Sequence, residues 1–147
     1  MHGLQDVTIL LVEDDPGHTR LIEKNLRRAN VTNELVFATN GQAAIDYLFC
    51  EGLYTGKKRA PLMLVLLDLN MPVLDGYQVL ERMKADERTR RIPVIILTTT
   101  DDPREVSRCY ELGCNVYITK PVDYEQFAEA MRKLGLFLLV VMIPDGG

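Results

Sequence analysis

The chain has 147 residues, a net charge of -4, 47% hydrophobic and 26% charged residues, and three cysteines. This length suits one domain that buries about two thirds of its unfolded surface. The acidic balance argues against a general nucleic-acid binder, which needs a basic face. The longest apolar run, 136–143, is too short to span a bilayer, and the N-terminus lacks a signal-peptide pattern. The cysteines have no metal-ligand spacing, so we expect reduced thiols in a cytoplasmic protein.

Short apolar runs alternate with helical patterns along the whole chain. We expect strands over 7–12, 34–38, 62–67, 92–97 and 116–119. We expect helices that begin at Pro16, after Asn40-Gly41, after Asp75-Gly76, at Pro103 and at Asp123, the fourth closing at Gly113 and the last running to about residue 134. The segment 52–61 is predicted to be an exposed basic loop.

Five consecutive strand–helix units predict an α/β fold with a parallel sheet, right-handed crossovers and helices on both faces. The expected form is doubly wound and flavodoxin-like, with strand order 2-1-3-4-5. The run 62–67 is apolar without interruption, which is typical of a strand buried on both faces. We expect a single domain over 1–147, with a core over about 8–134 and an apolar tail over 135–147.

Acidic residues follow two of the expected strands. Glu13 and Asp14 follow the first strand, and Asp68 follows the third. The carboxyl ends of parallel strands share one edge, so this strand order would bring the three carboxylates together. Close carboxylates repel one another and raise at least one pKa unless a cation is present. A hard divalent ion meets that need, and Mg2+, which keeps several waters, suits an open site with few protein ligands.

Two other strands end in residues that can contact an anion. Thr98 ends the fourth strand and Lys120 follows the fifth. Lys120 could neutralise Asp68 or pair with a phosphoryl oxygen as a point charge. The ordinary alternative is a surface lysine in a turn, and the neighbouring Thr99 and Thr100 make the assignment of Thr98 less unique. The four strand ends taken together carry more weight than any one of them.

At this point the sequence resembles the receiver domain of bacterial two-component response regulators, the CheY-like fold. The resemblance covers roughly residues 8–134. It rests on Glu13-Asp14, Asp68 within Leu-Leu-Asp-Leu-Asn-Met-Pro, Asp75-Gly76, Thr98 and Lys120-Pro121, in this order and at strand ends. Glu13 stands where the family also has Asp, which is an accepted variation.

The resemblance implies a phosphorylatable signalling switch without an output domain. Asp68 would accept a phosphoryl group from a histidine of a sensor kinase, in a Mg2+-dependent reaction. The roles implied for the other residues are metal coordination by Glu13, Asp14, Asp68 and the backbone carbonyl of Asn70, phosphoryl contact and switching by Lys120, Thr98 and Tyr117, and structural roles for Gly76 and Pro121, the latter with a cis peptide. We do not expect an enzyme: at most, the domain would catalyse its own phosphorylation and slow autodephosphorylation.

Two departures place the sequence within the family. The segment 49–61 is longer than in the shortest receivers, and the tail 135–147 continues past the last helix. With the run Cys-Tyr-Glu-Leu-Gly-Cys-Asn-Val-Tyr-Ile-Thr-Lys, these features are most similar to single-domain regulators that accompany bacterial phytochromes. A phytochrome-type kinase is therefore a candidate partner. The apolar tail suggests a homodimer contact through the tail and the fourth and fifth helical regions, although the tail could instead pack back on the domain.

Two alternatives come from other functional classes. An aspartate-nucleophile phosphohydrolase would need a second Asp as general acid/base, and Asn70 occupies that place. An interaction module that ignores phosphorylation is disfavoured by the intact Asp68, Thr98 and Lys120. His18 falls in the first turn of the first helix, where an exposed residue at a docking surface is a better interpretation than a phosphohistidine or a metal ligand.

Overall fold

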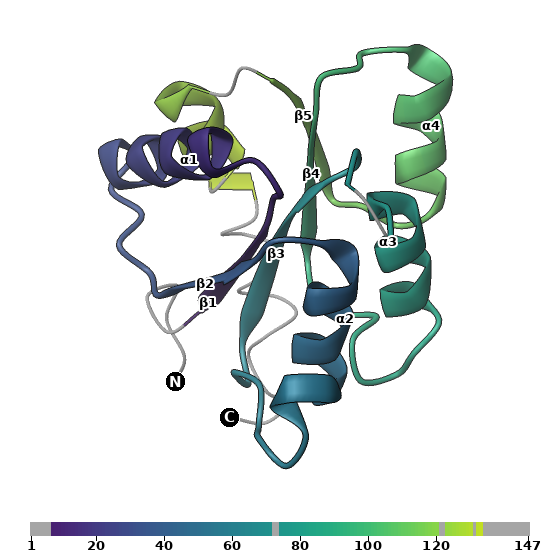
Figure 1. Cartoon of the computed structure of the whole chain (residues 1–147). Helices are drawn as coiled ribbons and strands as arrows, with labels where there is room; N and C mark the ends of the chain where they lie inside the picture. The colour runs from purple at the N-terminus through teal and green to yellow at the C-terminus, as the bar shows by residue number, and fades with distance from the viewer. Residues whose placement is uncertain (1–6, 72–73, 121–122, 131, 134–147) are drawn as a thin grey trace, which may run out of the picture.

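The computed structural model describes residues 7–71, 74–120, 123–130, 132 and 133. It contains one parallel sheet of five strands in the order β2-β1-β3-β4-β5, as predicted (Figure 1). The strands are β1 (Thr8–Val12), β2 (Leu35–Ala38), β3 (Met63–Asp68), β4 (Val94–Thr98) and β5 (Val116–Thr119). The helices are α1 (Pro16–Arg28), α2 (Gly41–Phe49), α3 (Gly76–Lys84), α4 (Pro103–Glu111) and a short 3-10 helix, η2 (Gly52–Tyr54). Residues 124–130 are also helical.

The sheet is buried on both faces by helices. Alternate residues of a strand point to opposite faces, so each apolar strand contributes to two separate cores. On one face, Leu10, Val65 and Ile96 pack with residues of α2, α3 and α4. On the other, Leu11 and Ile95 pack with α1 and with the helix at 124–130 (Figure 1). This explains why β1, β3 and β4 are buried along their whole length and are apolar except for one polar residue at an end of each, Thr8, Asp68 and Thr98 respectively.

The helix starts follow from local capping chemistry. Asp15 caps α1, and its side chain accepts hydrogen bonds from the backbone N–H groups of Gly17 and His18 at 2.8 and 3.1 Å. Pro16 occupies the first helical position, where a missing N–H costs nothing. Asp75 forms a capping box with Gln78 at the start of α3. These caps fix the chain direction just beyond the carboxyl ends of β1 and β3.

The sequence placed the elements correctly and missed some of their ends. The predicted strand at 92–97 begins only at Val94, because Pro93 has no N–H for the ladder, although its carbonyl accepts from Val65 N at 3.0 Å. The predicted loop at 52–61 contains η2, whose Leu53 is 89% exposed. Within the described residues no helix is long and apolar enough to cross a membrane. The predictions for Pro121 and the tail 135–147 lie outside the described residues.

Candidate functional site

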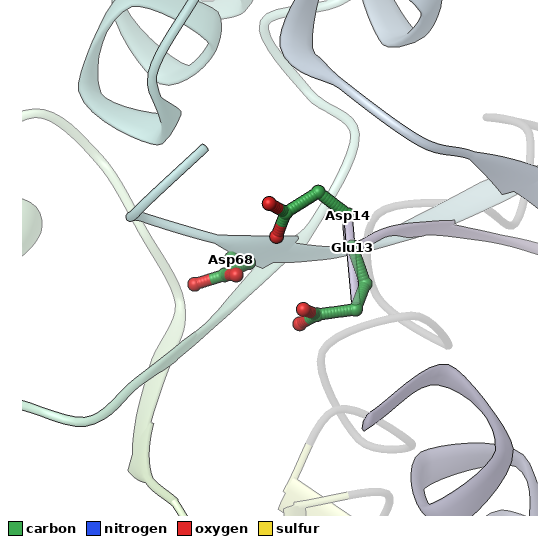
Figure 2. Close-up of side chains that lie close together, drawn as sticks. All are labelled: Glu13, Asp14 and Asp68. Atoms are coloured by element: carbon green, nitrogen blue, oxygen red, sulfur yellow. The ribbon is translucent and has the colours of Figure 1, made fainter. Parts of the chain in front are cut away.

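The three predicted carboxylates lie together at the carboxyl edge of the sheet. Figure 2 shows Glu13 and Asp14 leaving the end of β1 beside Asp68 at the end of β3. One oxygen from each of the three side chains lies within 4.8 Å of the others. The adjacency arises from the strand order, because β1 pairs directly with β3 and Val12 lies opposite Leu67. The topology therefore brings together residues that are more than fifty positions apart in sequence.

Lys120, at the end of β5, supplies the positive charge of the cluster. Its Nζ donates to Glu13 Oε2 at 2.7 Å and lies 3.6 Å from Asp68 Oδ2. The Lys120 and Glu13 side chains are only 10% and 1% exposed, so this ion pair is largely shielded from water. The sequence left two roles open for Lys120, neutralising Asp68 or pairing with a phosphoryl oxygen; the ammonium does lie beside Asp68, and its shortest contact is to Glu13.

Asp68 has an unusual environment for a carboxylate. Its side chain is buried, and burial raises its pKa to about 6 against the opposing effects of Lys120 and of the Asn70 N–H; the nearby Glu13 raises the pKa further. The Asn70 N–H donates to Asp68 Oδ1 at 3.1 Å. Asp68 is therefore ionised at neutral pH, but its charge is incompletely compensated and favours a cationic neighbour.

The donor set suits a hard divalent ion. Asp14 is exposed whereas Glu13 is buried, so the pair offers one carboxylate to solvent and holds the other in the interior. Mg2+ takes oxygen ligands, and the carboxylate oxygens of this cluster lie within 4.8 Å of one another, so Glu13, Asp14 and Asp68 would be able to hold such an ion. Asn70 is exposed and follows Asp68 by two residues. Coordination by its carbonyl stays a prediction.

Thr98 and Tyr117 lie on the two strands beyond β3. Thr98 is fully buried at the end of β4, and its Oγ1 accepts from Thr100 N at 3.3 Å. The Tyr117 hydroxyl donates to the Thr100 carbonyl at 2.5 Å, and burial raises the pKa of Tyr117 to about 12. Both predicted switch residues therefore contact the same segment after β4. Their movement stays a prediction.

Gly76 has a clear structural role behind Asp68. A Cβ at this position would lie 2.6 Å from the Asp68 carbonyl oxygen and 2.7 Å from Leu69 Cα. The Gly76 N–H also donates to the Leu69 carbonyl at 3.0 Å. Only a residue without a side chain allows α3 to start this close to the end of β3.

One residue at the site was not predicted to interact there. His18, in the first turn of α1, has its Nδ1 3.2 Å from Lys120 Nζ and 3.5 Å from Glu13 Oε1. Its side chain is 48% exposed, which agrees with the predicted surface position. The sequence places His18 on the first helical turn after the first strand, which indicates that it lies near the site. The sequence does not reveal which way the ring points.

Comparison with known proteins identifies the family. Residues 9–132 match the sequence family described as "Response regulator receiver domain", and the chain belongs to that family. It is 36% identical over 137 residues to "Response regulator Rcp1" of Synechocystis, with 92% of each chain covered. Among solved structures it is similar to a response regulator receiver domain from Rhodospirillum rubrum, with 55% identity, a TM-score of 0.72, and 94% and 97% of the two chains covered.

A further similar structure is the "Bacteriophytochrome response regulator RtBRR", with 37% identity and a TM-score of 0.80, covering 88% of this chain and 78% of that one. The structure of Rcp1, at 35% identity and a TM-score of 0.73 over 90% of this chain and 94% of that one, is of its Mn(2+)-bound form. Phytochrome response regulators are thus among the relatives of this receiver domain, and another relative, Rcp1, has been solved with a divalent metal bound.

Proposed function

We propose that this receiver domain accepts a phosphoryl group on Asp68 from a sensor histidine kinase, and signals through a change in its protein contacts. The observation that carries the proposal is the surroundings of Asp68. Its carboxylate lies at a strand end with Glu13 and Asp14 on one side and the Lys120 ammonium 3.6 Å away. A carboxylate in this setting can attack phosphorus while a positive charge stands ready for the oxygens of the transferred group.

In the proposed reaction an Asp68 oxygen attacks the phosphorus of a phosphohistidine. The new O–P bond forms as the P–N bond breaks, and the imidazole leaves with the bonding electron pair. The Asn70 N–H holds Asp68 Oδ1 at 3.1 Å, which leaves the other oxygen, facing Lys120, as the candidate nucleophile. Lys120 would then contact the phosphoryl group at the position where negative charge accumulates.

Glu13, Asp14 and Asp68, with the Asn70 carbonyl, are the residues that would hold a Mg2+ ion. When bound, the ion screens the negative charges of carboxylate and phosphoryl oxygens. The fit is supported by an all-oxygen donor set and by the exposure of Asp14, which leaves one side of the cluster open to solvent.

Intact mass measurement after incubation with Mg2+ and acetyl phosphate tests the proposal. We expect one added phosphoryl group on the wild-type chain, no addition when the metal is chelated, and no addition on Asp68→Asn. Glu51→Gln, a neutralised carboxylate far from the site, serves as the matched control and should be modified like wild type. An adduct on Asp68→Asn would place the acceptor elsewhere. The absence of any adduct on wild type would favour the interaction module.

The phosphohydrolase alternative makes a different prediction. It would release phosphate over many turnovers without a trapped adduct. Asn70 stands where such enzymes need a second carboxylic acid, and an amide cannot donate and accept a proton as that acid does. We therefore infer a signalling receiver, with no more turnover than slow loss of its own acyl phosphate.

The partners belong to the same proposal. A phytochrome-type sensor kinase is supported by relatives that are named as bacteriophytochrome response regulators. We also propose a cytoplasmic location, where such kinases present their phosphohistidine, and a homodimer through the tail 135–147 and the fourth and fifth helical regions. Sedimentation of the chain with and without residues 136–147 tests the dimer, and a monomer in both samples would contradict it.

A further inference from the structure

His18 makes a contact that the proposed reaction does not yet use. Its Nδ1 lies 3.2 Å from Lys120 Nζ. An ammonium group has three donors and no acceptor, so the two nitrogens form a hydrogen bond in the imidazole tautomer whose Nδ1 accepts. The carboxylate of Glu13 is farther from Nδ1, at 3.5 Å, which is beyond ordinary hydrogen-bond length. In this arrangement the hydrogen-bond partner of the His18 imidazole is therefore Lys120, and not Glu13.

The backbone beneath His18 is held in place by the helix cap. The His18 N–H donates to Asp15 Oδ1 at 3.1 Å, and the Thr19 hydroxyl donates to the Asp15 carbonyl at 3.0 Å. The first turn of α1 is thus ordered by Asp15, which fixes the backbone position from which the His18 side chain extends. A fixed acceptor can orient a flexible lysine, whose four-carbon chain otherwise has many rotamers.

The Lys120 ammonium has three N–H donors, and three acceptor atoms lie near it. Two acceptors lie close, Glu13 Oε2 at 2.7 Å and His18 Nδ1 at 3.2 Å, and the next charged group is Asp68 Oδ2 at 3.6 Å. When two donors of a tetrahedral ammonium are engaged, the direction of the third is fixed. Without His18, the ammonium could rotate about its contact to Glu13 and lose that direction.

We propose that His18 is a positioning residue, which orients the Lys120 ammonium toward Asp68 through the Lys120–His18 hydrogen bond. The proposal rests on the proposed phosphoryl transfer to Asp68 for its kinetic consequence, but the hydrogen bond itself can be measured independently. It gives His18 a role in the rate of the reaction in addition to its location on the surface.

Side-chain NMR of the unphosphorylated protein tests the hydrogen bond. We expect the 1H–15N signal of the Lys120 ammonium to be visible in wild type, where two acceptors slow its exchange, and to be lost in His18→Ala. His18→Asn should retain it, because the Asn Oδ1 occupies the place of Nδ1. A signal that is the same in wild type and His18→Ala, or absent from both, would overturn the proposal, even if Asp68 is phosphorylated normally.

The rate of adduct formation with acetyl phosphate and Mg2+ tests the consequence. His18→Ala should lower the maximal rate about three- to tenfold, the factor of one net hydrogen bond, with little change in the donor concentration at half-maximal rate. His18→Asn should restore the rate to within about twofold, whereas His18→Gln should not. Arg20→Ala, also exposed on α1, is the matched control and should react like wild type.

The outcomes separate this proposal from the proposed function. Equal rates for wild type and His18→Ala, or an equal loss in His18→Asn and His18→Ala, would overturn the positioning role. If wild type forms no adduct, the proposed function fails, and the ammonium signal alone then decides whether His18 holds Lys120.

Discussion

The two ends of the sheet carry charges in opposite environments. At the carboxyl end, the whole residues Glu13 and Asp68 are 3% and 5% exposed, and both form ion pairs with the ammonium of Lys120. At the amino end, in the segments before β3 and β4, the ion pairs Arg82–Glu51 and Arg88–Asp86 have side chains that are 30% to 62% exposed. The guanidinium groups of both arginines also lie over the ring of Phe49 (its centroid is 4.9 and 4.8 Å away), which holds them on the surface.

Two aspartates show what this difference does. Hydrogen bonds from the Arg88 side chain and backbone lower the pKa of Asp86 to about 2, whereas burial raises the pKa of Asp68 to about 6. Asp86 is hydrogen-bonded to Arg88 and surrounded by water, so its ionised form is stabilised. Asp68 is buried, and the attraction of Lys120 does not make up for the water that it has lost. Charge at the amino end is therefore fully accommodated, and charge at the carboxyl end is left available for a ligand.

The largest stability effect should come from Lys120→Met. Removing Lys120 leaves the buried Glu13 carboxylate without its ion-pair partner, so we expect a loss of about 2–4 kcal/mol in the free energy of unfolding at neutral pH. Urea denaturation measures it. Arg88→Met, at the exposed end, is the matched control and should cost much less, because water screens this pair. Equal losses in the two variants would remove the distinction between the two ends.

Asp68→Asn should stabilise the fold in a pH-dependent manner. The pKa of Asp68 is about 6 in the folded chain and about 3.8 when unfolded, so wild type binds more protons folded than unfolded between these values. The contribution of protonated Asp68 to the free energy of unfolding is therefore fully present below about pH 4 and is lost as the pH rises through 6. The variant should therefore match wild type near pH 4 and exceed it by roughly 1–3 kcal/mol at pH 7.5.

Asp86→Asn gives the opposite comparison. The folded pKa of Asp86 is lowered to about 2, so its favourable contribution is present above about pH 4 and is lost as pH falls through 2. This variant should be less stable than wild type at pH 7.5, with a small effect because the group is exposed. Thermal unfolding from about pH 2 to 7.5 follows both variants, and an Asp86→Asn variant that is as stable as wild type at pH 7.5 would contradict the assignment.

The smallest effect should be the coupling between Glu51 and Arg82. Their atoms are 3.5 Å apart and both side chains are about half exposed, so water and salt screen the pair. A double-mutant cycle with Glu51→Gln and Arg82→Gln should give a coupling below about 0.5 kcal/mol, and smaller still in high salt. A coupling above 1 kcal/mol would show that the exposed end also holds strong charge interactions.

The positions of the strands could be predicted because buried parallel strands leave a strong apolar pattern, and their order followed from the doubly wound fold that alternating strands and helices imply. The apolar run that leads to Asp68 identified β3, and turn and capping residues such as Asp15 and Asp75 located the helix starts. Strand ends were harder, as Pro93 shows, because an apolar residue can precede a strand without joining its ladder. The 3-10 helix Gly52–Tyr54 left no pattern, since one turn is too short to show a period.

Among the site residues, the sequence predicted which ones gather but not which ones pair. Strand ends bring Glu13, Asp68 and Lys120 to one edge whatever their rotamers. Whether Lys120 lies nearer Glu13 or Asp68 depends on side-chain angles and on differences of about an ångström. The contact between Lys120 and His18 also depends on side-chain angles, which a sequence pattern does not determine.

The ion pair between Lys120 and Glu13 has one more consequence, for the dose at which the domain responds to a divalent cation. A divalent cation that binds beside Glu13 meets the positive charge of this lysine, which lies 2.7 Å from Glu13 Oε2, and the two positive charges repel each other. This repulsion raises the apparent dissociation constant of the metal. The protein's own lysine thereby raises the metal concentration at which the domain responds.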